Sequence, residues 1–64
     1  MELSGYLGKR VYITTYEGNI YFGEVADYFY PDENESGKES IVVETINGKL
    51  IEFDEDDIRI IKEF

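Results

Sequence analysis

Tyrosine and carboxylate side chains are the groups in this sequence whose types and spacing could do chemistry. The chain has six tyrosines and 15 Asp or Glu residues, and it lacks both cysteine and histidine. Aromatic faces beside carboxylates attract basic or methylated side chains through cation–π and ion-pair contacts. The common zinc sites, Cys or His nucleophiles and His acid–base pairs are excluded. The residue types therefore predict partner binding, with no catalytic residue, no metal and no cofactor.

Tyrosines and one run of acids form the predicted partner site. Six tyrosines exceed what so small a core can bury with every hydroxyl hydrogen-bonded, so some must lie on the surface. Tyr12 and Tyr16 share one face of an expected strand. Alternatively, the same rings cover a core edge or form a subunit interface. The candidate partner-binding residues are Tyr12, Tyr16, Tyr28, Tyr30, Asp54, Glu55, Asp56 and Asp57.

One acidic stretch contains part of a calcium-binding pattern. Asp32, Asn34, Ser36 and Gly37 fall at the first, third, fifth and sixth positions of a calcium loop. The pattern fails at the twelfth position, where Val43 stands in place of the bidentate glutamate, and strand-like sequence flanks it in place of helices. A solvated turn is therefore the preferred interpretation.

Length and charge restrict both the size of the protein and its partners. The chain has 64 residues, which allow one domain, 1–64, with a core of marginal stability unless association adds to it. The net charge of −9 opposes binding to nucleic acid or an anionic membrane, because such surfaces are bound through Lys and Arg. The sequence shows neither a membrane span nor a signal peptide, so a cytoplasmic location is expected.

Alternation of apolar and polar residues predicts β-strands along most of the chain. The expected strands are 11–16, 20–29, 40–46, 49–53 and 58–62. Tight turns are expected around Gly18 and at Asn47-Gly48, which is a strong signal for a two-residue hairpin turn. Gly23 is expected to mark a bulge or sharp bend in the long second strand.

These strands predict a small closed barrel, because an open sheet of this size would expose its edges. Single helical turns are expected at 3–7, as a plug for one barrel end, and at 54–57. Residues 31–39 contain turn-favouring types and predict a solvated loop. The expected fold class is all-β, a five-stranded and strongly bent antiparallel barrel.

Three segments resemble motifs of the Sm-like superfamily of small barrels. Its opening Leu and Gly-Lys are similar to Leu7-Gly8-Lys9, its charged turn with glycine is similar to Glu17-Gly18-Asn19, and Gly23 matches the glycine that bends its second strand. The resemblance covers residues 7–30 and, more faintly, 49–61. It implies an Sm-like or SH3-like barrel.

The resemblance also implies a mode of assembly. Members of the superfamily typically form rings by pairing the fourth and fifth strands of neighbours. By analogy, the self-association residues here are Ile51, Phe53, Ile58 and Ile60. Where the family has an Arg-Gly that contacts RNA, this chain has four carboxylates at 54–57, which would repel phosphate.

The expected function is that of a non-catalytic Sm-like barrel that self-associates or binds proteins and lacks general affinity for RNA. Two alternatives stay open. The chain could be a monomeric adaptor that binds basic or methylated peptides through its tyrosines and acids, or an acidic mimic of nucleic acid. An RNA-binding Sm-like protein ranks lower. The expected partner is a second copy of the chain or a protein with a basic surface.

Overall fold

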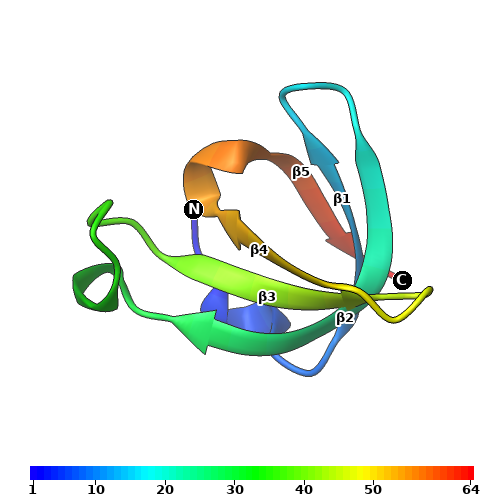
Figure 1. The fold of residues 1–64 in the computed structure, drawn as a ribbon, viewed down its shortest axis with the longest axis horizontal. Helices are drawn as coiled ribbons and strands as arrows, with labels where there is room; N and C mark the ends of the chain where they lie inside the picture. Colours follow the sequence, from blue (N-terminus) through cyan, green and yellow to red (C-terminus); the bar gives the residue numbers. More distant parts are fainter.

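The computed structural model describes residues 1–64 as five strands joined in one antiparallel sheet (Figure 1). The strands are β1 (Arg10–Thr15), β2 (Ile20–Phe29), β3 (Ser40–Thr45), β4 (Leu50–Asp54) and β5 (Ile58–Glu63). Three single 3-10 turns are η1 (Ser4–Tyr6), η2 (Pro31–Glu33) and η3 (Glu55–Asp57). The predicted all-β fold class is confirmed, including the helical turn near the N-terminus, and each strand begins and ends within one residue of its expected bounds.

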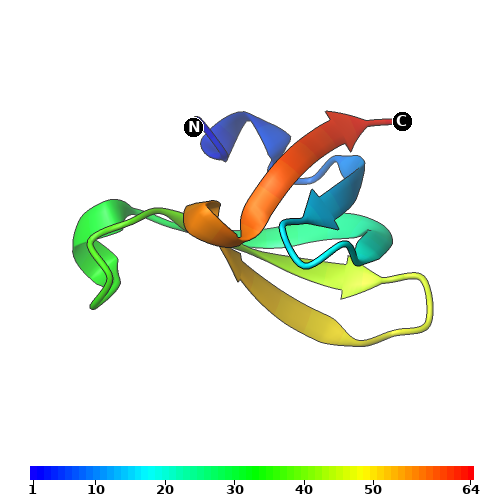
Figure 2. The same cartoon turned by 90° about the horizontal axis from the view of Figure 1, so that it is seen from above.

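The long strand β2 belongs to both halves of a sheet with the strand order β4-β3-β2-β1-β5. Residues 20–24 of β2 pair with β1, whereas residues 23–29 pair with β3. The sheet therefore curls, and Figure 2 shows β1 and β5 lying across from β3 and β4. The two ends of the sheet, β4 and β5, are connected by η3 and form no ladder with each other.

Gly23 occupies the point where β2 changes partners. A Cβ atom there would clash with the carbonyl oxygen of Glu44 and would lie 2.7 Å from a side-chain carbon of Val43. Close approach of two backbones is thus the reason for glycine. The expected bulge lies elsewhere in β2, because the pairing register with β3 shifts between Val25 and Asp27.

The two hairpin turns share one construction, at residues 15–19 and 45–49. In each turn the glycine amide donates to the threonine carbonyl, at 3.0 and 2.8 Å, and the glycine has a φ of +90° or +85°. The amide of the last residue donates to the threonine hydroxyl, at 3.3 and 3.1 Å. The two-residue turn expected at Asn47-Gly48 is therefore wrong: only the glycine has a positive φ, and the loop is longer.

The core lies between the two halves of the curled sheet. Its buried apolar residues are Leu3, Val11, Ile13, Val25, Ile41, Val43, Phe53 and Ile58. All of them except Leu3 lie within the strands, on the inward-facing side that the alternating pattern predicts. Leu3 is fully buried and precedes η1, so the N-terminal segment contributes directly to the core.

Glu39 holds this N-terminal segment in place. Its carboxylate accepts hydrogen bonds from the Leu3 amide at 3.0 Å and from the Tyr28 hydroxyl at 2.9 Å. Residues 31–39 were predicted to form a solvated loop. This prediction is wrong for Glu39, which is buried. The Met1 amino group pairs with Glu55 at 3.0 Å, and this hydrogen bond raises the pKa of the amino group. No helix of the structure is long and apolar enough to span a membrane.

Candidate partner-binding site

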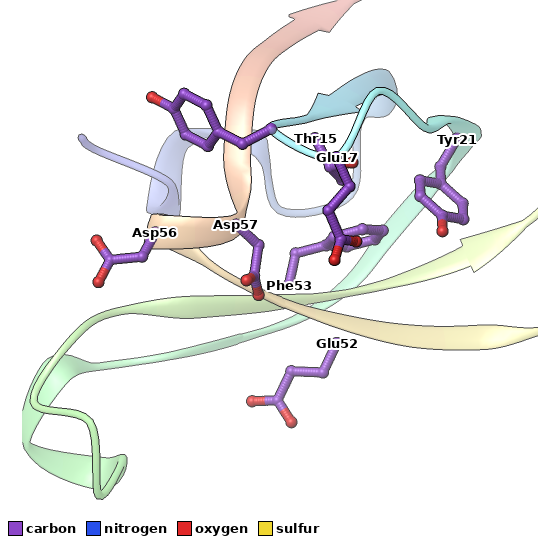
Figure 3. A pocket seen from close by; sticks show the side chains of 8 residues that line it. Thr15, Glu17, Tyr21, Glu52, Phe53, Asp56 and Asp57 are labelled. Carbon is purple, nitrogen blue, oxygen red and sulfur yellow. The ribbon is translucent and has the colours of Figure 1, made fainter.

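A pocket of about 290 Å³ lies between the β1–β2 turn and η3 and combines aromatic rings with carboxylates (Figure 3). We call it the acidic pocket. Its lining residues are Thr15, Tyr16, Glu17, Tyr21, Glu52, Phe53, Asp56 and Asp57. Four of the eight are acidic and none is basic. The pocket therefore matches the predicted combination of tyrosine and carboxylate, with a different set of residues.

Aromatic side chains form the base and one side of the acidic pocket. Phe53 is buried, and the Tyr21 ring meets it edge to face at 5.1 Å between centroids. Tyr21 points inward because it lies opposite Ile13 in the β1–β2 ladder. Tyr16 is 71% exposed, and its amide donates to the Asp57 carbonyl at 3.4 Å, which ties the hairpin turn to η3.

The carboxylates of the acidic pocket have no basic partner in the molecule. The ion pair between Met1 and Glu55 is the one salt bridge in the structure. In Figure 3, Glu17 points its carboxylate toward the Phe53 ring, whereas the Asp57 carboxylate is turned toward the β4 backbone, where it accepts from the Asp54 amide. Glu52 leaves β4 on the side opposite Phe53, and its carboxylate accepts from the Ser40 hydroxyl at 2.8 Å. The three other carboxylates, near the rings of Tyr16 and Tyr21, would attract a cation such as a lysine or arginine side chain.

Of the four acidic residues at 54–57, two form contacts within the protein away from the acidic pocket and two line the pocket. Asp54 caps η3, because its carboxylate accepts from the Asp56 amide at 3.4 Å and from the Ser36 hydroxyl at 2.8 Å. Glu55 is held in the ion pair with Met1. Asp56 and Asp57 line the acidic pocket, and Asp57 also accepts from the Asp54 amide at 3.1 Å. Only two of these four predicted residues therefore line the acidic pocket.

The four predicted tyrosines are separated by the fold. Tyr16 lines the acidic pocket, whereas Tyr12 lies on the outer face of the sheet, 6.1 Å from the Phe22 ring. The two do not share a strand face, because β1 ends at Thr15. Tyr28 and Tyr30 form an edge-to-face pair at 5.1 Å near η2. Burial and the Glu39 carboxylate raise the pKa of Tyr28 to about 12.

Sequence reasoning missed Glu17, Tyr21 and Glu52 as members of the acidic pocket. Glu17 belongs to the turn expected around Gly18, and Glu52 reaches the rim of the pocket from the outward side of β4. The pairing of the first hairpin offered a signal for Tyr21, since residues at its position face the same side as Ile13. No local pattern shows that the first hairpin turn and η3 meet.

The predicted self-association residues lie on the two edge strands in different environments. Phe53 and Ile58 are buried in the core, at 4% and 1% exposure. Ile51 and Ile60 are partly exposed. Association through these edges would therefore rest mainly on backbone hydrogen bonds along β4 and β5.

Polar side chains of the partial calcium pattern are engaged within the protein. The Asn34 side-chain amide donates to the Lys38 carbonyl at 2.7 Å and to the Ser40 hydroxyl at 3.0 Å. The Ser36 hydroxyl donates to Asp54. No group of three or more acidic side chains is arranged to hold a metal ion. The polar residues Asn34 and Ser36 are therefore explained by the hydrogen bonds that they form within the protein.

No protein-family model matches the chain, and no curated protein or solved structure is significantly similar to it. The resemblance to Sm-like proteins stays a prediction from the sequence. Functional interpretation therefore rests on the geometry of the sites.

Proposed function

We propose that the protein is a non-catalytic interaction module of the cytoplasm whose acidic pocket binds a cationic side chain of a protein partner. The observation that carries this proposal is an exposed tyrosine, Tyr16, in a pocket whose lining residues include four acidic residues and no basic one. A lysine, methylated lysine or arginine side chain can lie against the exposed Tyr16 ring while its charge stays near Glu17 and Asp57. The same negative charge supports the proposal that the module lacks general affinity for RNA.

The test is a titration of the labelled protein with a short lysine-containing peptide, followed by NMR. We expect shifts at residues of the acidic pocket. Tyr16→Ala and Asp57→Asn should each weaken binding about two- to five-fold, because exposed ion pairs and cation–π contacts contribute up to about 1 kcal/mol. Asp57→Asn keeps an oxygen that can accept from the Asp54 amide, so η3 retains its cap.

Two matched variants serve as controls. Tyr30→Ala removes a tyrosine that is 61% exposed outside the pocket, and Asp32→Asn removes an exposed carboxylate outside it. Both should bind the peptide like the unmodified protein. Equal affinity of all four variants would contradict the proposal, and an RNA oligonucleotide that shifts the spectrum at physiological salt would contradict the lack of RNA affinity.

A second candidate function is self-association through edge strands, as in the rings of Sm-like proteins. The observation that favours it is the sheet order, which leaves β4 and β5 with one unpaired edge each. Exposed edges commonly pair with another chain, and cyclic symmetry would satisfy every edge. Native mass spectrometry tests this candidate: a closed ring of several copies supports it, and a monomer at all concentrations contradicts it.

A further inference from the structure

A patch of large apolar side chains lies on the outer face of the sheet, away from the acidic pocket. We call Ile20, Phe22, Ile46 and Phe64 the outer patch. These large apolar side chains are exposed to solvent, by 59%, 45%, 84% and 57% respectively. Ile20, Phe22 and Ile46 line one hollow on this face, and two contacts connect Phe22 with Phe64 and with Ile46. The rings of Phe22 and Phe64 pack edge to face at 5.9 Å, and the Ile46 amide donates to the Phe22 carbonyl at 3.1 Å.

The outer patch follows from strand alternation in β2. Gly23 and Val25 face the core, so Phe22 and Glu24 must face outward. Tyr12 lies directly opposite Phe22 on β1 and extends the aromatic surface. Contiguous exposed apolar surface of this kind marks an interaction site on a small monomer. The outer patch and the acidic pocket have no residue in common, although Tyr21 lines both the acidic pocket and a hollow beside the outer patch.

Charges of both signs border the outer patch. Arg10 lies opposite Glu24 across the β1–β2 ladder, and Glu24 lies opposite Glu44 across the β2–β3 ladder. Neither carboxylate forms a salt bridge with Arg10, whose guanidinium carbon lies 5.8 Å from the centre of the Phe64 ring. Two like charges directly opposite each other destabilise a sheet. A cation from outside the chain would relieve this repulsion.

We propose that the outer patch is the interface of a symmetric homodimer in which Arg10 of each copy faces Glu24 and Glu44 of the other. A two-fold axis places the same surface on both sides, so the surface must be complementary to itself. The outer patch meets this condition because its apolar centre has a basic residue on β1 and two acidic residues on β2 and β3. A uniformly basic partner would be repelled by Arg10, whereas a second copy uses both signs.

The small size of the chain supports a second copy as the occupant. A standard interface buries about 800 Å² per partner, which is roughly a fifth of the 4276 Å² surface of this chain. Only 12 of its 64 residues are buried, so further burial would add considerably to a small core. The net charge of −9 opposes association of two copies, so the interface must lie where opposite charges meet, as Arg10 meets Glu24 and Glu44 in the proposed dimer, with the acidic pocket outside it.

The first experiment measures the mass of the native particle over a range of concentrations by light scattering. We expect a dimer for the unmodified chain and at least a tenfold weaker dimer for Ile46→Asp. Ile46 is 84% exposed, so this substitution leaves the core intact, and circular dichroism checks the fold. Tyr30→Asp is the control, because it places the same charge on an exposed residue outside the outer patch.

A charge-exchange experiment tests the predicted contacts. Arg10→Glu and the double variant Glu24→Lys, Glu44→Lys should each be monomeric alone, because their like charges meet at the interface. Mixed together, they should form a heterodimer, since each acid then faces a base. A monomeric unmodified chain, a dimer insensitive to Ile46→Asp, or a larger ring that survives Ile46→Asp would overturn the proposal. Peptide binding at the acidic pocket should not change in Ile46→Asp, which separates the two proposals.

Discussion

Two neighbouring threonines on β1 have the same side chain and opposite environments. The Thr14 hydroxyl is buried and has no hydrogen-bond partner. The Thr15 hydroxyl accepts a hydrogen bond from the Asn19 amide at 3.3 Å and so helps to close the first hairpin turn. A buried hydroxyl without a partner loses its hydration and gains nothing in return. The two positions therefore allow a direct comparison of one substitution.

We expect Thr14→Val to stabilise the protein by up to about 1 kcal/mol, because valine has the same shape and no polar atom. Thr15→Val should destabilise it by about 0.5–1.5 kcal/mol, because the Asn19 amide loses its acceptor. Chemical denaturation of both variants measures the free energies of unfolding. The same sign of change at both positions would contradict this account.

Tyr28 should make stability depend on pH in the alkaline range. Burial, followed by the hydrogen bond to Glu39, raises its pKa from 10.0 to about 12. The folded state therefore favours the neutral phenol. Its contribution to stability is complete below pH 10 and is lost as pH rises through 12.

Tyr28→Phe is the variant that isolates this contribution. Its melting temperature should lie below that of the unmodified protein at pH values under 10, and the difference should shrink toward pH 12. Tyr30→Phe, which changes the neighbouring ring, should show no such pH-dependent difference. A constant gap between Tyr28→Phe and the unmodified protein up to pH 12 would argue against the assignment.

At the scale of elements, the bend of β2 depends on Gly23. We expect Gly23→Ala to destabilise the protein by about 1–3 kcal/mol, since the new methyl group meets the Glu44 backbone and Val43. Gly5→Ala is the matched control, because a Cβ at Gly5 meets nothing within 4 Å and the residue has no positive φ. Thermal unfolding monitored by circular dichroism distinguishes the two. Equal stability of both variants would show that the sheet can open at the bend.

The two hairpin turns were predictable from the sequence in position but not in loop length. Both turns use threonine at the first position and glycine at the fourth, at residues 15–19 and 45–49, with the same hydrogen bonds. The glycine positions were predictable because a positive φ favours that residue. The loop length was not, because Asn47-Gly48 fits a two-residue turn equally well until the strand register is known.

At the scale of the whole molecule, repulsion among carboxylates opposes folding. The net charge is −9, and the structure has one salt bridge, between Met1 and Glu55. Added sodium chloride screens this repulsion, so we expect the melting temperature to rise with ionic strength. A gain of about 1 kcal/mol corresponds to roughly 4–8 °C in a domain of this size. Sucrose at equal osmolality is the control, and a melting temperature that falls with salt would contradict the prediction.

The sequence by itself determined the strands, the positions of the turns and the charge of this protein. Alternation of apolar and polar residues is a local property, so the five strands were found within one residue at each end. Glycines such as Gly18 identify turns for the same local reason. Net charge needs no structure at all, because it is a sum over the side chains of the sequence.

Only the tertiary structure decided which side chains meet. Tyr16 joins Asp57 at the acidic pocket because the first turn packs on η3, about forty residues later in the chain. Glu39, in a loop that looked solvated, is buried because Leu3 and Tyr28 need its carboxylate. These contacts follow from strand pairing between distant segments, and a shift of one residue reverses the face of every side chain. Local sequence patterns do not contain that information, because the register is set by the packing of the whole sheet.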